Sequence, residues 1–371
     1  MTRVLLASFD RVPAPKGASQ HILANLEALA TRHDVSLVTL GDRPLPGVRH
    51  LPVALDEPNW LRRALLFRER LTRVLAEEPA DAYHVRSPWE GLAAPAGPPL
   101  VYEANGFMSV EAGYHFPRVP ALPGLRDKLR RLEDALLDRA TVVVTPSAVT
   151  AAYVEDRGVE AARVRVVPNA PAVPLAAGPV EPAGEALRLL YVGTLAAWQG
   201  VDDLLRALPA VRAPWTLTVL TSAPERRRRR LLRRAARLGL GGRVDVREAV
   251  DPADLPAVLR AHDVGVAPLV PCERNLVQGC QPIKLLDFMA SGLPVLAADL
   301  PVVREVVGDD APLYARARHD ALVDLLERLA AGPAWRAELA RAGLARVQAR
   351  FSREAQRAAL LGVYEEVFDG G

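Results

Sequence analysis

Cysteine, lysine and long apolar runs are all scarce in this chain of 371 residues. Its two cysteines, Cys272 and Cys280, are too few for a disulfide framework, and their spacing does not match the CxxC pattern of a zinc knuckle. No apolar run is long enough to span a membrane. The opening MTRVLLASFD gains charge too early for a signal peptide and predicts a first strand. We therefore expect a cytoplasmic protein without a bound metal.

The basic residues are almost all arginine, and the formal net charge is only +3. Two segments concentrate these arginines on amphipathic helical patterns, residues 60–75 (WLRRALLFRERLTRVL) and 225–240 (ERRRRRLLRRAARLGL). The first interpretation is that each segment forms a helix whose apolar side packs in the core and whose arginines face the solvent. The alternative is contact with an anionic membrane surface. Nucleic acid is not expected, because no aromatic residues interleave with the arginine runs.

Short apolar runs alternate with helical patterns along most of the chain. Strands are expected at residues 4–8, 35–40, 82–86, 100–103, 141–146 and 163–169, and again at 187–193, 216–220, 243–247, 264–269 and 293–298. The Pro- and Ala-rich residues 171–186 lack periodicity and predict a linker between a domain at 1–170 and a domain at 187–352. The alternation predicts two parallel α/β sheets, with ligands bound at the carboxyl ends of their strands in a cleft between the domains.

Two glycine-containing turns follow expected strands. Gly17 opens a helix after the first strand, and its free amides and the helix dipole would favour an anion. Gly193 ends the first strand of the second half and is followed by Thr194 and Gln199 before the next helix. Phosphate contact and an ordinary strand–helix turn are both compatible with these patterns. Neither contains GxGxxG, so a dinucleotide-binding dehydrogenase has no support here.

A third such turn lies in CERNLVQGCQPIKLLDFMASG, residues 272–292. Pro282 suits the first turn of a helix, so the amides of Ile283 and Lys284 would be free to meet a phosphate. Asp287 shares a helix face with Ile283 and would stand beside that phosphate, where it could accept bonds from ribose hydroxyls. The alternative is that Asp287 is a plain charge near the start of a helix.

The order of these motifs resembles retaining glycosyltransferases of the GT-B fold, family 4. TLAAWQGVDDLL followed by PIKLLDFMASGLPVLAAD is similar to the C-terminal domain of that family, and PAPKGASQHILANLEALATRHDVSLVT is similar to its first loop and helix. The resemblance implies two Rossmann-like domains facing a cleft, with the final helix, residues 353–371, crossing back to the first domain. It implies transfer of a sugar from a nucleoside-diphosphate sugar such as a UDP- or GDP-sugar to a glycan, lipid or small molecule, with retention and without a required metal.

The resemblance also assigns site residues by position. Asp287 aligns with the second Glu of the family's E-x7-E motif, which holds the donor ribose. Residues 280–283, with Gln281 and Pro282 among them, align with the turn whose amides meet the diphosphate.

Several positions depart from the family pattern. Gly279 stands where the motif has its first Glu, and Thr194 and Gln199 stand where an Arg and a Lys usually neutralise the diphosphate. We expect Lys284 to compensate as the main catalytic cation. Arg274 and Asn275 are further candidates for donor contact.

A third departure lies in the first half of the chain. Glu103 and Asn105, in YEANGF, replace a histidine of the family, and either could approach the transferring sugar. Because charged contacts are missing, a non-catalytic nucleotide-sugar-binding protein, or a partner subunit of a glycosyltransferase, is the alternative function.

Overall fold

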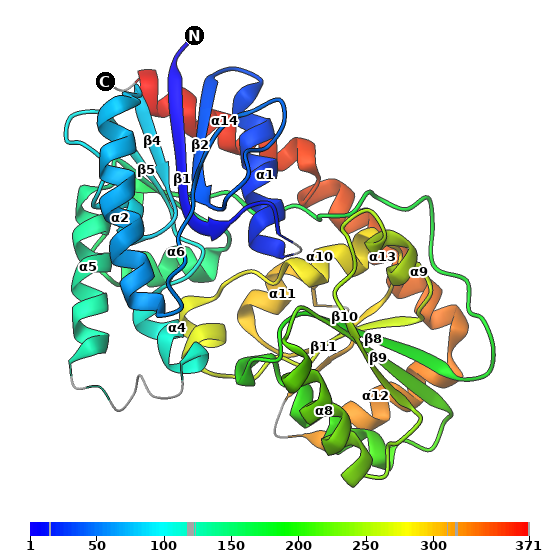
Figure 1. The fold of residues 1–371 in the computed structure, drawn as a ribbon. Coiled ribbons are helices and arrows are strands. Elements are labelled where there is room, and N and C mark those ends of the chain that lie inside the picture. The colour runs from blue at the N-terminus through cyan, green and yellow to red at the C-terminus, as the bar shows by residue number, and fades with distance from the viewer. Residues whose placement is uncertain (15, 117–121, 123, 310, 316–317, 370–371) are drawn as a thin grey trace. The chain divides into compact units, whose positions relative to one another are not determined.

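The computed structural model describes residues 1–14, 16–116, 122, 124–309, 311–315 and 318–369. The chain divides into two compact units, Met1–Asn169 with Glu354–Gly371, and Ala170–Arg353 (Figure 1). Each unit has its own parallel sheet, so the predicted pair of Rossmann-like units is confirmed.

The first unit is built on a seven-stranded sheet with the order β3-β2-β1-β4-β5-β6-β7, in which the pairs are parallel. Its strands are β1 (Arg3–Arg11), β2 (Asp34–Leu40), β3 (Arg49–Val53), β4 (Ala82–Val85), β5 (Leu100–Glu103), β6 (Val142–Thr145) and β7 (Val164–Val166). Its helices are α1 (Gly17–Ala30), α2 (Trp60–Glu77), α3 (Pro88–Gly91), α4 (Met108–His115), α5 (Leu125–Arg139), α6 (Ala148–Glu155), the short 3₁₀ turn Ala161–Arg163 and α14 (Arg353–Asp369).

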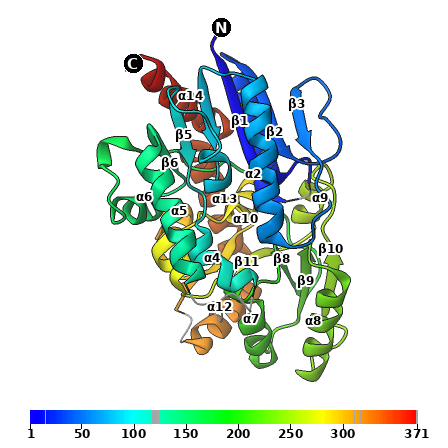
Figure 2. The same ribbon diagram turned by 60° about the vertical axis from the view of Figure 1, so that its left-hand side comes forward.

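Alternate residues of β1 face opposite layers, as expected for a strand buried on both sides. Leu5 packs with Phe67 of α2, in a core that α5 and α6 also line. Leu6 packs with Ile22 of α1 and with Leu360 of α14 on the other face. Figure 2 shows this layering, with α14, which comes from the far end of the chain, behind the sheet and α2 in front of it.

The second unit has a six-stranded sheet with the order β10-β9-β8-β11-β12-β13, again with parallel pairs. Its strands are β8 (Leu187–Val192), β9 (Trp215–Thr221), β10 (Val244–Glu248), β11 (Val264–Ala267), β12 (Val295–Ala298) and β13 (Leu313–Tyr314). Its helices are α7 (Val201–Ala207), α8 (Glu225–Arg237), α9 (Leu255–Arg260), α10 (Ile283–Ala290), α11 (Pro301–Val307), α12 (His319–Ala331) and α13 (Pro333–Arg350), with 3₁₀ turns at Ala197–Gln199 and Leu208–Ala210 and a π-helix at Arg274–Gln278.

Helix α10 lies directly on the sheet because β11 has a glycine beneath it. A Cβ atom on Gly265 would lie 2.3 Å from the ring of Phe288, so only glycine lets this ring pack so close. The segment expected as a linker also packs on this helix, with Ala176 N–H donating to Ala290 O at 2.7 Å and Val180 N–H to Gly292 O at 3.0 Å. These contacts fix the position of α10, whose first turn forms part of the candidate site.

Candidate active site

The strand order reverses at one place in each sheet, between β1 and β4 in the first unit and between β8 and β11 in the second. Loops that follow two such strands leave in opposite directions, which opens a crevice at the carboxyl ends where α/β proteins bind ligands. The residues predicted from the sequence lie at or after the carboxyl ends of strands in the two sheets, or at the starts of the helices that follow them. Each edge is described by itself below.

At the edge of the second unit, Gly193 makes room for a lysine. It follows β8 with φ +145°, and a Cβ atom there would lie 2.9 Å from Lys284 Nζ and 3.0 Å from the Tyr191 hydroxyl. The Tyr191 hydroxyl donates to the carbonyl of the exposed Thr194 at 2.6 Å. The glycine turn therefore brings Lys284 against the end of β8.

Lys284 is held by groups that leave its charge poorly compensated. Its Nζ donates to Gln199 Oε1 at 2.5 Å and lies 4.4 Å from the centre of the Tyr191 ring. Burial of the ammonium group, and then the nearby Arg274 guanidinium, lower the pKa of Lys284 to about 7. Gln199 stands where the family has a lysine, and here its amide oxygen binds this lysine instead. A ligand with negative charge would supply the compensation that the described neighbours of Lys284 do not.

Two residues of the π-helix next to this lysine have different roles: Asn275 joins two loops, and Arg274 supplies positive charge. Asn275 is 1 % exposed, and its Nδ2 donates to the carbonyls of Trp198 at 3.0 Å and Val270 at 2.8 Å. Both of its donor hydrogens are used, so Asn275 joins two loops, which differs from the donor contact expected from the sequence. The Arg274 guanidinium lies 3.6 Å from the centre of the Trp198 ring and supplies positive charge near Lys284.

The turn before α10 contains Gly279, the residue that the resemblance places at the first glutamate of the motif. Gly279 has φ 69° and ψ 38°, a left-handed conformation that side chains other than glycine rarely adopt. Gln281 is buried, and Pro282 precedes the first helical residue, Ile283. The first amides of a helix have no partner within it, and the first turn of α10 contains no acidic residue. The start of α10 is thus suited to an anion.

The corresponding helix after Gly193 is not suited to one. Helix α7 carries Asp202 and Asp203 in its first turn, and these carboxylates would repel a phosphate. Gly200 serves packing there, because a Cβ atom on it would lie 1.6 Å from the carbonyl oxygen of Pro268. The loops after β8 and β11 meet at this contact.

Asp287 lies one turn further along α10, and its carboxylate accepts hydrogen bonds from backbone amides of the same unit. Its Oδ1 accepts from Ala172 N–H at 2.7 Å. Burial raises the pKa of Asp287 to about 7, although the amides of Ala172 and Val173 and the charge of Arg353 oppose the increase. A carboxylate offers about four acceptor positions, so these amides leave capacity for a further donor such as a ribose hydroxyl.

At the edge of the first unit, Glu103 is the centre of a buried network. It is 3 % exposed, and it accepts from Asn25 at 3.1 Å, His84 at 3.1 Å and Arg86 at 3.1 Å, and also from His21 and Asn105. Burial alone would raise the pKa of Glu103, but the charge of Arg86 and the hydrogen bonds from His21 and His84 outweigh it and hold the pKa well below its usual value.

Five donors exceed the four acceptor positions of one carboxylate. The predicted direct approach of Glu103 to a sugar therefore does not fit this placement. Glu103 instead orients its neighbours, of which Asn105 is only partly buried.

Arg86 extends this network to the point where the strand order reverses. Its Nη1 donates to Asp10 Oδ2 at 2.9 Å, and this pair bridges the ends of β1 and β4. Asp10 is half-exposed and also accepts from Ser8 at 3.0 Å. Sequence reasoning missed Asp10, Arg86, His21 and His84, which come from separate segments. The one available signal was the pair of polar residues that end β1 and β4.

Gly17 is the other predicted residue of this unit, and it begins α1 as expected. Helix α1 has no acidic residue in its first turn, and Lys16 precedes it. The structure thus brings together Gly193, Gln199, Arg274 and Lys284 in the second unit, while Gly17, Glu103 and Asn105 belong to the first.

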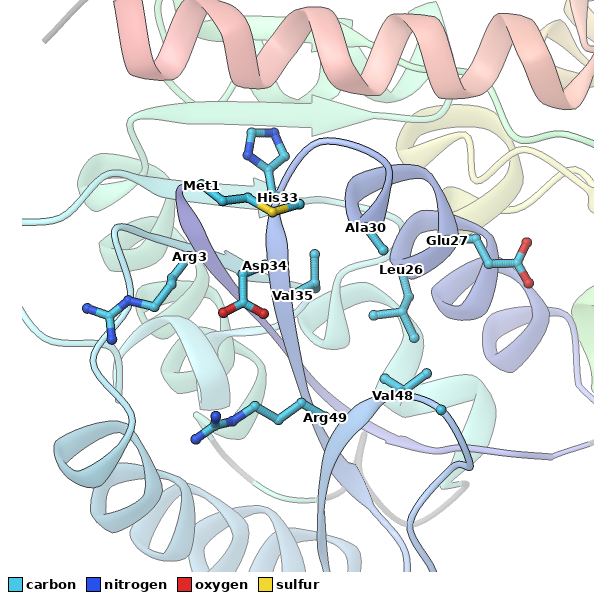
Figure 3. Close-up of a pocket in the computed structure, with 11 residues that line it drawn as sticks. Met1, Arg3, Leu26, Glu27, Ala30, His33, Asp34, Val35, Val48 and Arg49 are labelled. Atoms are coloured by element: carbon cyan, nitrogen blue, oxygen red, sulfur yellow. The ribbon is translucent and has the colours of Figure 1, made fainter.

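A cavity of about 580 Å³ lies elsewhere in the first unit (Figure 3). It is lined by the first residues of three strands, Arg3, Asp34 and Arg49. It is therefore at the amino end of the sheet, opposite the edge that carries Glu103, and does not belong to the candidate site. Among the described residues, no group of three His, Cys, Asp or Glu side chains could hold a metal ion, and no helix is long and apolar enough to cross a membrane.

The two parallel sheets, each in its own helix-covered unit, have the two-domain Rossmann-like arrangement of the GT-B architecture. Residues 15–170 match the family model described as Glycosyltransferase Family 4, and residues 186–331 match the model described as Glycosyl transferases group 1. These two matches span most of the chain, which therefore belongs to the glycosyltransferases. The expected enzyme class is confirmed, in preference to a dehydrogenase.

Solved structures support the same fold. Sucrose-phosphate synthase from Thermosynechococcus elongatus is 20% identical with a TM-score of 0.81, and the match covers 100% of both chains. HepE from Anabaena, in complex with UDP-glucose, is 17% identical with a TM-score of 0.75 and covers 99% of this chain and 100% of its own. An α,α-trehalose-phosphate synthase from Burkholderia vietnamiensis is 14% identical with a TM-score of 0.73, covering 100% of both chains. A direct sequence comparison with curated proteins finds no match.

Proposed function

We propose that this glycosyltransferase moves a sugar from a nucleoside-diphosphate sugar, and that the donor diphosphate binds at the β8–β11 edge of the second unit. The observation that carries the proposal is Lys284, an ammonium group with a pKa lowered to about 7, set beside the free amides at the start of α10. A diphosphate would restore the charge balance of this lysine. The proposal gives Gln199 and Gly193 the task of placing its Nζ atom.

The proposed catalysis is mainly electrostatic. When the sugar–phosphate bond breaks, negative charge grows on the leaving diphosphate. Donors that are already oriented toward that charge lower the barrier without reorganising. Lys284, the amides of Ile283 and Lys284, and the charge of Arg274 would supply this stabilisation, so the proposal requires no metal ion.

Asp287 is proposed to hold the donor ribose with the acceptor capacity that the amides of Ala172 and Val173 leave free. For the donor base we favour uridine or guanosine. The uridine option has the support that HepE, a protein of the same fold, binds UDP-glucose.

The acceptor, a glycan, a lipid or a small molecule, is assigned to the first unit. Asn105, held by Glu103, is proposed to contact the transferring sugar, and the amides at Gly17 to contact the donor phosphates. We propose retention of anomeric configuration, with the acceptor attacking from the face of the leaving group. No carboxylate nucleophile is assigned, since Glu103 is saturated by its donors.

We also propose that the arginine-rich helices contact an anionic membrane surface. On α2, Leu61, Leu65 and Leu66 are 36%, 52% and 39% exposed and stand among arginines. Apolar side chains combined with basic ones suit the headgroup region of an anionic bilayer. Helix α8 adds the exposed Arg226, Arg230, Arg233 and Arg237, which share one face.

Vesicle pelleting tests the membrane proposal. The protein should pellet with phosphatidylglycerol-containing vesicles at low salt, less with pure phosphatidylcholine, and less when the three leucines of α2 are replaced by serine. Leu175→Ser, at another exposed leucine, is the matched control. Equal recovery with both vesicle types would refute it.

A nucleotide panel tests the donor proposal. UDP, GDP and ADP are compared by thermal shift, and UDP-glucose, UDP-galactose and GDP-mannose by release of the nucleoside diphosphate. We expect a rise in Tm with UDP or GDP and its loss in Lys284→Met, while the exposed Lys128→Met behaves as wild type. No shift with any nucleotide would end the donor-site proposal.

A further inference from the structure

The buried network of the first unit connects its catalytic edge to the last helix of the chain. Two histidines, His21 on α1 and His84 on β4, each place Nε2 on one oxygen of Glu103. Each also places Nδ1 on a side chain of α14. The hydroxyl of Tyr364 lies 2.9 Å from His84 Nδ1, and the Gln356 amide nitrogen lies 3.4 Å from His21 Nδ1.

The chemistry of these contacts determines which ring nitrogen carries the hydrogen. Glu103 is ionised and can only accept, so Nε2 of both histidines must donate. A neutral imidazole then has Nδ1 as its acceptor, and the partners on α14 are both donors. Tyr364 keeps its hydrogen, because burial and the charge of Glu103 raise its pKa. Every hydrogen bond in the chain from α14 to Glu103 thus runs in one direction.

The packing leaves little freedom for another arrangement. His84 and Tyr364 are both fully buried, and their rings are stacked with an interplanar angle of 4°. Gln356 is 6% exposed, and the hydrophobic residues around Tyr364, including Leu360 and Val363, pack on β1 and α1. Helix α14 therefore presents its two donors at fixed positions.

We propose that Tyr364 and Gln356 are positioning residues for sugar transfer, and that they act by holding the rings of His84 and His21 in place through Nδ1, while Glu103 fixes Nε2 as the nitrogen that carries the hydrogen. With both Nε2–H groups on Glu103, that carboxylate is held in one orientation, and it in turn orients Asn105 and Arg86 at the edge of the sheet. This inference rests on the proposed role of Asn105 at the transferring sugar. It gives α14 a part in the reaction besides its packing.

Two conservative variants test the inference. Tyr364→Phe keeps the ring and removes the donor to His84, and Gln356→Leu keeps the volume and removes the donor to His21. Arg357→Gln, an exposed position on the same helix, is the matched control. Long-range ¹H–¹⁵N NMR spectra report which ring nitrogen carries the hydrogen, with signals assigned through His84→Gln and His21→Gln. Steady-state release of nucleoside diphosphate from UDP-glucose, UDP-galactose and GDP-mannose reports turnover.

In the wild type, we expect both histidines to carry hydrogen on Nε2. Tyr364→Phe should leave the hydrogen of His84 on Nε2, shift the His84 Nδ1 signal because its hydrogen bond is lost, and lower kcat about five- to tenfold, the effect of one lost hydrogen bond, with nucleotide affinity unchanged. Gln356→Leu should do the same through His21. If both variants keep the wild-type Nδ1 signals and kcat and lose only Tm, the helix has a structural role alone and the inference is overturned.

The two proposals fail in different ways. If the wild type releases nucleoside diphosphate from none of these donors, the proposed function loses its support for them. The NMR spectra of the two histidines still test the inference in that case. Wild-type histidines with hydrogen on Nδ1 would overturn the inference even if turnover is robust.

Discussion

The lysine at the second edge gives a prediction that depends on pH. If Lys284 is the cation that binds the diphosphate, its ammonium form is the one that binds. Its pKa of about 7 in the ligand-free protein means that binding above this pH must take up a proton. The affinity for UDP should then fall about tenfold for each pH unit above about 7. Lys284→Met should lose this slope and weaken binding at pH 7 about 10- to 100-fold, the range for a charge-assisted bond.

The lowered pKa of Lys284 also predicts how stability depends on pH. Stability should rise with pH, whereas the affinity for UDP should fall. Its folded pKa of about 7 lies below its usual value of 10.5, so the unfolded chain binds more protons between these pH values. Stability should therefore rise with pH from about 7 to about 10. The lowering from 10.5 to about 7 is worth about 5 kcal/mol, and the partial exposure of Lys284 reduces this to about 1–3 kcal/mol.

Lys284→Met is thus expected to be at least as stable as the wild type at pH 7 while binding UDP more weakly. Isothermal titration calorimetry at pH 7, 8 and 9 measures the slope, and buffers of different ionisation enthalpy report the proton uptake. Urea unfolding measures stability, with Lys128→Met as control. A flat pH dependence in the wild type, or an unchanged slope in Lys284→Met, would refute the reasoning.

Two further predictions concern the packing of this edge. Gly200→Ala should cost about 3 kcal/mol or more, because its Cβ would lie 1.6 Å from Pro268 O at φ +73°. Gly239→Ala, at the same φ with open space, should cost only about 1 kcal/mol; equal losses by urea unfolding would contradict the packing argument. Asp287 has a folded pKa raised to about 7, so its contribution to stability should be lost as pH rises from about 4 to 7. Asp287→Asn should flatten stability in that window, and an unchanged profile would speak against burial as the cause.

Most of the fold could be predicted from the sequence because periodicity reports burial directly. Expected strands such as residues 35–40 and 100–103 agree closely with β2 and β5. Strand β3 was missed because RHLPV contains proline and histidine and forms an edge strand. The π-helix at Arg274–Gln278 was read as a loop, since five residues carry no periodic signal.

The two halves of the site differ in how much the sequence reveals. Lys284 and Gln199 could be named from local motifs because each lies in the segment where a strand is followed by the start of a helix. The partners of Glu103 could not, because His21, His84 and Tyr364 are far apart in sequence and the sheet order brings them together. Only the fold shows that five donors occupy the Glu103 carboxylate. This is why Glu103 is now proposed to orient Asn105 and not to contact the reacting sugar.

The most direct test of the central claim is a crystal structure of the protein soaked with UDP. The account predicts the diphosphate at the β8–β11 edge, with oxygen atoms within about 3.2 Å of Lys284 Nζ and of the first amides of α10. A diphosphate bound away from Lys284, such as in the cavity beside Arg3 and Arg49, would contradict it.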